Sequence, residues 1–401
     1  MSMQRDEKMV VALTGCSHAL THGYLLIYPT VLLLLQKEFS LGFFQLGLIG
    51  NIMTFCYGLG ALPGGLIYNY LGPKRLFLFC FLGSSLAVIL AGMSNSLIFF
   101  ATGLALLGSL GSVYHPLANA LITAKVYEFG RALGIHGATG NIGLALAPFV
   151  IGLIASSLGW RYAFLLSAVP GLLLSVWSLF VDMSVTKGEG LTSLSSSEEG
   201  TPFKKVKAFF SLPLVLLYLV NMMQSFASFG SLTFLPTYLS KRTSFQLLSL
   251  DPVALGGILS ALVLATGGLG QYMGGILAQR PHLRRSLLMV SALSVPCILV
   301  MSFVTHFSLM AIALVFFFLN FSLQPLCNTL VARATAPGMR GTAFGVYFFL
   351  SFAFGSLASS FCGLIAETFE LRWVFMGLSS SVLLLTFFAW MLNRVHMKTP
   401  E

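Results

Sequence analysis

The side chains most able to do chemistry in this sequence lie inside long apolar segments. Residues 112–125 read SVYHPLANALITAK and residues 322–333 read SLQPLCNTLVAR, so both segments share one pattern of polar side chains around a proline. Imidazole titrates closer to neutral pH than other side chains, and an amide both donates and accepts hydrogen bonds. If the fold gives them an aqueous cavity, these groups can bind a polar solute or carry a proton.

Two further histidines, His18 and His22, are four residues apart and so share one face of a helix. None of the 12 acidic residues lies in the middle of an apolar segment, because each falls in a tail, a loop or a helix end. If the chain moves protons, His18, His22 and His115 are therefore the expected carriers. The alternative for each of them is a structural hydrogen bond between helices.

The composition indicates a membrane protein. Hydrophobic residues make up 57% of the chain and charged residues 8%, whereas a soluble domain has about 25% charged residues. Apolar stretches of about 20 residues, which cross a bilayer as helices, recur through the sequence. The alternating polarity of an outer-membrane barrel is not found. We therefore predict an all-α integral membrane protein.

Charged or turn-forming residues divide the chain into twelve expected transmembrane segments. The first six cover about 9–34, 43–69, 75–94, 96–124, 131–157 and 161–182, and the other six about 207–239, 253–279, 285–304, 307–332, 341–365 and 372–393. The Ser-, Gly- and Glu-rich stretch between them cannot bury enough apolar surface to fold. We expect a six-helix bundle over 1–182, a linker over 183–206 and a second six-helix bundle over 207–401.

The positive charges indicate the orientation of these segments. Of the 22 Lys and Arg residues, five fall on the side opposite to the termini, namely Lys37, Arg161, Lys241, Arg242 and Arg372. The others gather on the side of the termini and the linker, which the positive-inside rule assigns to the cytoplasm. The net charge of +10 thus reflects membrane topology and predicts no nucleic-acid partner. The first apolar segment is too long for a signal peptide and is expected to remain in the protein.

The two expected bundles repeat one another. At an offset of 209 residues, matches occur between His115-Pro116-Leu117 and Gln324-Pro325-Leu326, Asn119 and Asn328, and Arg131 and Arg340. Six segments followed by six matching segments share one orientation, which is the parallel repeat of a two-bundle secondary transporter. Such transporters bind their substrate near the bilayer midplane, between the repeats.

Several polar side chains are expected at that depth. His18 and His115 are each ten residues from a lysine at the inner surface, which places them roughly 15 Å deep at about 1.5 Å per residue. The predicted site for a solute or proton comprises His18, His22, His115, Asn119, Asn221, Gln224, Asn320 and Gln324. Hinges or packing sites are predicted at Pro116, Pro148, Pro325, Gly140 and Gly143. His136 lies close to Arg131, and we interpret it as a structural residue near the inner mouth.

Residues 64–76, GGLIYNYLGPKRL, resemble the signature loop between the second and third segments of the major facilitator superfamily. The resemblance implies a cytoplasmic gating loop, to which we assign Gly65, Asn69, Gly72, Lys74, Arg75, Arg131 and Arg340. Asn69 stands where the family usually has Asp. An amide cannot form the ion pair through which that carboxylate latches one conformation.

Within the superfamily, residues 17–168 are most similar to the branch of fosmidomycin-resistance exporters, through stretches such as VYHPLANALI and GWRYAFLL. GNIGLALAPFVIG also resembles the drug-exporter motif of the fifth segment, with Ala147-Pro148 in place of Gly-Pro. The resemblance implies a secondary active transporter of the bacterial inner membrane. It would export a drug or metabolite by alternating access, with protons as the candidate coupling ion. The sequence does not determine its oligomeric state, and a monomer is one of the alternatives.

Two other functions remain open. A membrane-embedded enzyme could use His18, His22 and His115 as a metal or acid–base cluster, although the same layer offers no carboxylate to complete it. A receptor or assembly protein could share the fold without transporting. Nucleotide-binding GxxxxGK[ST] and hydrolase GxSxG patterns are absent from the sequence. We therefore predict no catalytic residue, metal or cofactor, and as partners a small-molecule substrate and the lipid bilayer.

Overall fold

The computed structural model describes residues 4–184, 211–243, 250–335 and 340–395. Within them, twelve helical stretches are long and apolar enough to cross a membrane. This confirms the predicted all-α membrane class and the number of spans. Most of the linker predicted at 183–206 lies outside the described residues, so the division into two domains stays a prediction.

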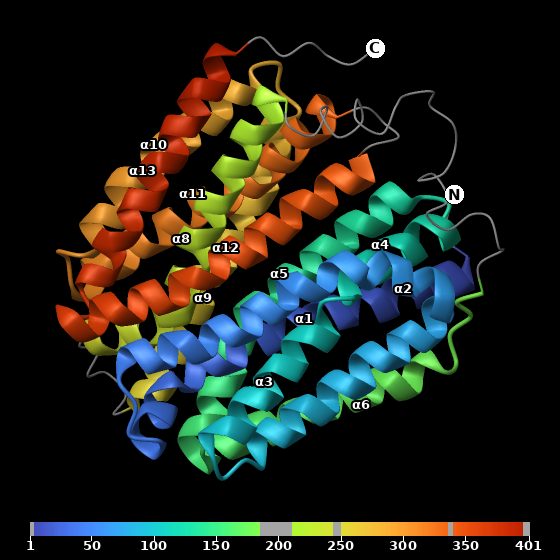
Figure 1. Ribbon diagram of the computed structural model, residues 1–401, viewed down its shortest axis with the longest axis horizontal. Coiled ribbons are helices and arrows are strands. Elements are labelled where there is room, and N and C mark those ends of the chain that lie inside the picture. The colour runs from blue at the N-terminus through green and yellow to red at the C-terminus, as the bar shows by residue number, and fades with distance from the viewer. Residues whose placement is uncertain (1–3, 185–210, 244–249, 336–339, 396–401) are drawn as a thin grey trace.

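Twelve helices account for these spans (Figure 1). The first six spans are formed by α1 (Arg5–Glu38), α2 (Phe43–Gly92), α3 (Leu97–Gly111), α4 (Tyr114–Lys125), α5 (Phe129–Leu158) and α6 (Trp160–Ser178). The other six are α8 (Leu212–Arg242), α9 (Pro252–Ala278), α10 (Leu283–Met301), α11 (His306–Ala334), α12 (Arg340–Thr368) and α13 (Trp373–Arg394). α2 contains two spans that meet at Gly72, whose φ of 73° suits glycine, and α3 and α4 together form the fourth span.

Each set of six helices packs around its own apolar side chains. Fully buried aromatic residues include Phe100 and Phe164 in the first set and Phe316 and Phe375 in the second. Large apolar side chains such as Leu86, Ile98 and Phe180 also cover the outside of the molecule. An apolar outer surface is stable only against hydrocarbon, which agrees with the membrane class.

The two sets meet where glycines let backbones touch. A Cβ on Gly47 of α2 would lie 2.2 Å from the carbonyl oxygen of Ser359 in α12, and one on Gly257 of α9 would lie 2.2 Å from that of Pro148 in α5. Small residues allow helices to approach this closely in lipid. Both glycines lie near the first turns of α2 and α9, so these contacts form at the end of the molecule remote from the termini.

At the end that holds both termini, the two sets diverge (Figure 1). Four glycines at this end have no atom within 4 Å of an added Cβ. They are Gly134 and Gly137 near the start of α5, Gly275 near the end of α9 and Gly345 near the start of α12. The two sets are therefore tightly packed at one end of the bundle, called the closed end, whereas these glycines of the other end lie in open space.

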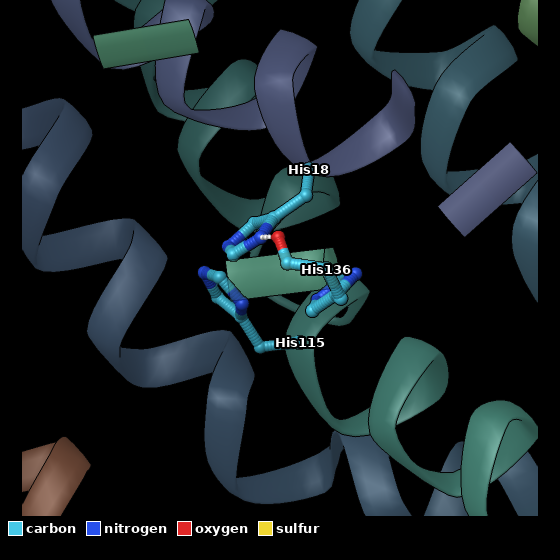
Figure 2. A group of neighbouring side chains, drawn as sticks. All are labelled: His18, His115 and His136. Carbon is cyan, nitrogen blue, oxygen red and sulfur yellow. Dashed lines mark hydrogen bonds between the residues drawn. The ribbon is translucent and has the colours of Figure 1, made fainter. Parts of the chain in front are cut away.

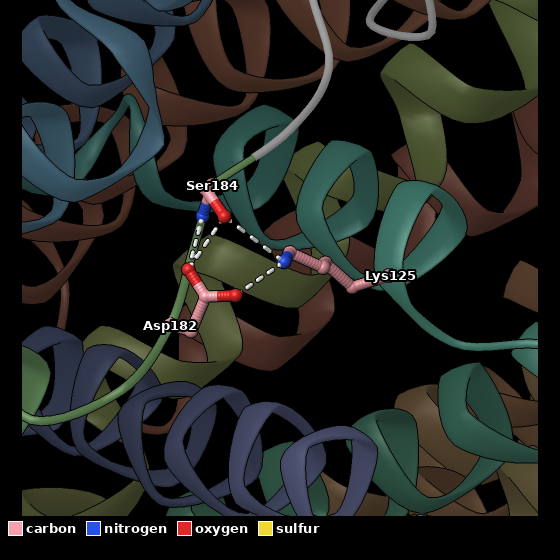
Figure 3. A network of polar contacts seen from close by, with 3 residues as sticks. All are labelled: Lys125, Asp182 and Ser184. Carbon is pink, nitrogen blue, oxygen red and sulfur yellow. Dashed lines mark hydrogen bonds and ion pairs between the residues drawn. The ribbon is translucent and has the colours of Figure 1, made fainter.

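A polar contact fixes the segment that leaves the first set of helices (Figure 3). Lys125, at the end of α4, donates to Asp182 at 2.8 Å, and Asp182 accepts from the backbone N–H of Ser184 at 2.9 Å. The hydrogen bond from Lys125, aided by Ser184, holds the pKa of Asp182 below its usual value. The stabilisation from this charged carboxylate is therefore present at neutral pH and disappears as the pH falls through the lowered pKa.

At the closed end, a carboxylate of the second set caps a helix of the first. Glu367 in α12 accepts a hydrogen bond from the backbone N–H of Phe44, in the first turn of α2, at 2.8 Å. These first N–H groups have no partner within the helix and carry partial positive charge, so a carboxylate is a favourable acceptor. A Cβ on Gly42 would lie 2.3 Å from Glu367 Oε2, so glycine leaves room for the carboxylate.

We expect Glu367→Ala to favour conformations that are open at this end, because α2 loses its acceptor from the other set of helices. A cysteine at Asn51, in a background without the native cysteines, should then react about tenfold faster with a thiol reagent in detergent solution. Glu370→Ala is the matched control, since Glu370 is at the same end but pairs with Arg372 at 2.8 Å. Equal acceleration by both variants would contradict a specific role for Glu367.

Candidate functional site

The fourth span is interrupted just before His115, between the end of α3 and the start of α4. Pro116 has no N–H, so the carbonyl of Ser112 lacks the donor that a continuous helix would supply. Gly108 and Gly111 precede the break, and glycine has a low helix propensity. The interruption is local, because Ser112 and Val113 keep right-handed helical backbone angles, and His115 lies in the first turn of α4.

The matching proline in the second half does not interrupt its helix. α11 runs from His306 to Ala334 through Pro325. Bulky residues precede this proline in place of glycines, and Phe316 and Phe317 are fully buried in the core. The repeated sequence pattern thus gives two different local structures.

Four imidazoles from three helices form one cluster. His18 and His22 of α1 have ring centroids 4.6 Å apart, and those of His18 and His115 of α4 are 5.0 Å apart. The ring of His136 of α5 stacks on that of His18 at 4.0 Å and 8° (Figure 2). His18 thus contacts all three of the other rings. It is 8% exposed and His136 is 4% exposed.

Hydrogen-bond partners assign the tautomers of His18 and His22. Nδ1 of His18 lies 2.6 Å from the carbonyl oxygen of His136, so this nitrogen carries a hydrogen. Nε2 of neutral His18 is then an acceptor, and Nε2 of His22, 3.0 Å away, donates to it. If His18 gains a proton on Nε2, the donor becomes His18 and His22 must adopt its other tautomer. The two rings can therefore exchange a proton along this bond.

Small residues on α5 make room for the cluster. A Cβ on Gly140 would lie 2.5 Å from Cε1 and 2.6 Å from Nδ1 of His18. One helical turn further on, a Cβ on Gly143 would lie 2.1 Å from the carbonyl oxygen of Ala19. These two predicted packing positions thus let α5 approach α1 closely enough for the imidazoles to stack.

Aromatic rings connect the cluster with the second set of helices. Tyr57 of α2 has its ring centroid 6.2 Å from that of His115 and 4.9 Å from that of Phe352 in α12. Its buried hydroxyl has no hydrogen-bond partner among the residues that the structure describes. On the other side of the cluster, Tyr114 donates a hydrogen bond to the carbonyl of Thr14. A change in the position of His115 can therefore displace Tyr57 and alter its contact with Phe352, at the interface between the two sets.

The geometry of the cluster is poorly suited to coordinating a metal ion. Ligand nitrogens of His18, His115 and His136 all lie within 4.8 Å of one another, the one such group in the described part of the chain. Zinc–nitrogen bonds of about 2.0–2.1 Å would hold two of its ligands at most about 4.2 Å apart. The nearly parallel rings of His18 and His136 also aim their in-plane lone pairs away from a common centre. The geometry suits hydrogen bonding and proton binding better than closed metal coordination.

Three predicted amides of the second half are engaged within that half. Asn221 donates to the carbonyl of Tyr347 at 2.9 Å, and Gln224 donates to the carbonyl of Asn320 at 3.0 Å. The side chain of Asn320 donates to Ser228 at 2.8 Å. All three amide side chains are more than nine-tenths buried. These contacts join α8 to α11 and α12, which is the structural role that such amides often have in membrane proteins.

Gln324 belongs to a different group that crosses between the halves. Gln271 of α9 donates to Gln324 of α11 at 2.6 Å, and Asn141 of α5 donates to Gln271. All three are partly exposed. Asn119 is exposed and lies one turn beyond His115, toward Lys125. No hydrogen bond within the described ranges joins these amides to the histidine cluster.

The described residues of the predicted gating loop make their hydrogen bonds and ion pairs within the first half. Lys74 donates to the carbonyl of Leu179 at 2.6 Å, and Arg131 lies 3.5 Å from Glu128. Arg75 is exposed. The side chains of Asn69 and Arg340 and the surroundings of Gly65 lie outside what the structure describes. In the part that it does describe, the loop makes no bridge between the halves in this conformation.

Sequence reasoning missed three residues. His136 is absent from the predicted site, but it lies four residues before Gly140, on the same helical face, and Gly140 packs against the ring of His18. Asn141 and Gln271 were overlooked, although each is an isolated amide in an apolar span. That isolation is the signal that could have identified them, because polar groups at this depth need a partner.

The amino-acid sequence is similar to those of known membrane transporters. A family model described as Major Facilitator Superfamily matches residues 12–360. A probable sulfoacetate transporter of Cupriavidus necator is 28% identical over 345 residues, 78% of this chain and 78% of that protein. A multidrug resistance protein, MdtG, of a Rahnella species is 35% identical over 172 residues, which are 42% of this chain and 40% of that protein.

Solved structures show the same fold. A bacterial homologue of the human lysosomal transporter Spinster, crystallised in an inward-facing and unoccupied conformation, superposes with a TM-score of 0.81 at 15% identity, covering 98% of each chain. A D-xylose–proton symporter superposes with a TM-score of 0.79 at 13% identity, covering 98% of this chain and 99% of that one. At these identities the likeness concerns the fold alone.

Gly140→Ala should disrupt the histidine stack, because the added methyl group overlaps the ring of His18. We expect the protein to lose about 1–3 kcal/mol of stability, the usual cost of overpacking, measured as a lower thermal unfolding midpoint in detergent. Gly137→Ala, almost one turn earlier on the same helix, meets open space and should be neutral or slightly stabilising. Equal destabilisation by both variants would contradict the contact between Gly140 and His18.

Asn141 and Gln271 should be energetically coupled, because their hydrogen bond joins the two halves. We expect a double-mutant cycle of Asn141→Ala and Gln271→Ala to give a coupling of about 0.5–2 kcal/mol in unfolding free energy. A cycle of Asn141→Ala with Gln224→Ala, whose side chains share no hydrogen bond, should give a coupling near zero. Similar values in both cycles would refute a direct bond.

Proposed function

Because the chain belongs to the Major Facilitator Superfamily and is thus a membrane transporter of small solutes, we propose that it is a proton-coupled exporter that works by alternating access. The observation that supports this best is the cluster of His18, His22, His115 and His136 at the predicted depth of a substrate site. The family and the relatives are transporters, which removes the enzyme alternative.

The cluster can bind a proton, and in the described part of the chain no neighbouring charge offsets that proton. The titratable groups that face His18 are His22 on α1, Tyr114 and His115 on α4, and His136 on α5. Tyr57 of α2 faces His115. None of these groups is an acid, a lysine or an arginine, so protonation changes the cluster from neutral to positive. Water or an anion must then stabilise the added charge.

This change of charge supplies a link to conformation. A charged cluster favours the arrangement in which the cluster is hydrated, and the contact of His115 with Tyr57 and Phe352 transmits the change to the interface of the halves. In this proposal, domains 1–182 and 207–401 rock against each other around the closed contacts. With the termini in the cytoplasm, as the distribution of positive charge favours, the present conformation is the inward-open one.

The direction of transport is proposed from likeness. The multidrug resistance relative supports export, in line with the resemblance of residues 17–168 to the fosmidomycin-resistance branch. In an exporter of this kind, a proton and a cationic or neutral substrate occupy the cavity in turn, and inward proton flow drives the substrate out. Protonated imidazoles repel a cation, so the two ligands exclude each other.

A second candidate function is proton-coupled movement of a small organic anion. The observation in its favour is that the cationic groups the cluster can provide are its own protonated imidazoles, and a relative aligned over 78% of this chain is a probable sulfoacetate transporter. In that case, the proton and the anion bind together and travel in the same direction. The charge of the substrate that binds therefore distinguishes the two candidates.

The test begins with a thermal-shift screen of purified protein against sulfonates, carboxylates and cationic drugs. The best ligand is then followed in proteoliposomes, with and without a pH gradient. We expect His18→Gln/His22→Gln/His115→Gln to abolish the stimulation by the gradient while ligand exchange at equal pH persists. Glutamine keeps the hydrogen-bonding capacity but cannot be protonated near neutral pH.

His306→Gln is the control, because His306 is an exposed histidine at the start of α11. It should leave the stimulation by the gradient unchanged. If the triple variant responds to the gradient as the wild type does, the proposed role of the histidines is wrong. If wild-type protein in vesicles moves none of the ligands that it binds, the receptor alternative is favoured instead.

A further inference from the structure

A basic hollow lies far from the histidine cluster, at the end of the molecule that holds the termini. It is lined by the start of α10, the end of α11 and the end of α13, and has a volume of about 400 Å³. Its polar lining consists of His282, Arg284 and Arg285 of the α10 start, Arg333 of α11 and Asn393 of α13. The hollow is large enough for a small ligand or a lipid headgroup.

The arginines of the hollow have no carboxylate partner in the described ranges. Arg284 donates to the backbone carbonyls of Leu392 and Val395, and Arg333 donates to that of Ala278 at 3.4 Å. These bonds hold the walls of the hollow together. Arg285 is exposed. The acidic residues described in this half are Asp251, Glu367 and Glu370, which all lie near the opposite end of the helices.

The start of α10 adds to this positive charge. Arg284 and Arg285 lie in its first turn, where the helix dipole is positive and where acidic residues are favourable. That turn contains no acidic residue, and the N-cap, His282, makes no side-chain capping hydrogen bond. An anion in the hollow would offset the repulsion between the helix end and the three guanidinium groups.

The surface next to the hollow indicates where this anion comes from. Met289 and Leu293 follow Arg285 at intervals of four residues along α10, and they are 64% and 55% exposed. Trp390 precedes Asn393 by three residues on α13 and is 45% exposed, with Arg394 placed over its ring at 5.3 Å. Aromatic and basic residues arranged in this way mark the level of lipid headgroups. The acyl chains of a lipid can pack on the apolar faces that continue from the hollow, whereas a free anion makes no contact with them.

We propose that this hollow binds the phosphate headgroup of an anionic phospholipid, with the acyl chains along α10 and α13. Guanidinium groups suit phosphate oxygens because they present several N–H donors in one plane. The bound lipid would join the ends of three helices of the second half. This proposal does not depend on the direction of transport or on the coupling ion.

The test is native mass spectrometry of the full chain in detergent, titrated with phosphatidylglycerol or with phosphatidylcholine. We expect one phosphatidylglycerol to bind more tightly than the others and more tightly than phosphatidylcholine. Arg285→Gln should weaken that binding about fivefold, the effect expected for one arginine near a headgroup. Arg280→Gln is the matched control, since it removes the same charge from the same face but does not line the hollow.

Thermal unfolding checks that the variants are folded, and Arg285→Lys keeps the charge if Arg285→Gln does not fold. The lysine variant should bind phosphatidylglycerol less tightly than the wild type does. It should still bind phosphatidylglycerol more tightly than it binds phosphatidylcholine. Equal weakening by Arg280→Gln and Arg285→Gln would overturn the proposal, because binding would then depend on the charge of the whole face. It would also be overturned if inorganic phosphate alone stabilised the wild type as much as phosphatidylglycerol does, because the site would then take a free anion.

Discussion

The structure depends on one constraint, namely that a polar group inside a membrane protein needs a partner or water. The chain has few charged residues, and the partners of its buried polar groups are mostly backbone carbonyls and other neutral side chains. Hydrogen bonds of this kind contribute modestly in membranes, whereas an unpaired group costs more. The pairing of His18 with the carbonyl of His136 and the pairing of Asn221 with that of Tyr347 follow from the same constraint, although only the first involves a side chain that can gain a proton.

The two halves satisfy this constraint with different chemistry. In the first half, histidines gather around the break at Ser112, and glycines on α5 provide the space. In the second half, amides and hydroxyls connect α8 with α11 and α12, and α11 remains continuous through Pro325. Among these buried polar groups, a change of protonation is thus limited to the histidines of the first half. The other half offers neutral side chains whose hydrogen bonding does not change between pH 5 and 8.

The sequence predicts local features of this structure better than contacts between distant segments. Twelve spans follow from apolar runs of the length that a bilayer requires, and the structure brings His18, His22 and His115 together, as counting along the helices suggested. His136 is not among the predicted site residues, because counting from Arg131 gives a depth but not the ring of His18 on which it stacks. The bond between Asn141 and Gln271 joins residues 130 positions apart, and no spacing rule predicts such a pair.

The closed end is held by contacts that can separate at moderate cost. Glycines at Gly47 and Gly257 give close backbone packing without directional bonds, and Glu367 and Asn51 supply hydrogen bonds across that interface. One charge-assisted bond contributes about 1.5–3 kcal/mol, and one pH unit of proton gradient corresponds to about 1.4 kcal/mol. Reversing a conformational equilibrium from 1:99 to 99:1 takes about 5.5 kcal/mol. A gradient can therefore drive the proposed cycle only if its two conformations differ by a few kcal/mol, which an interface with so few directional bonds allows.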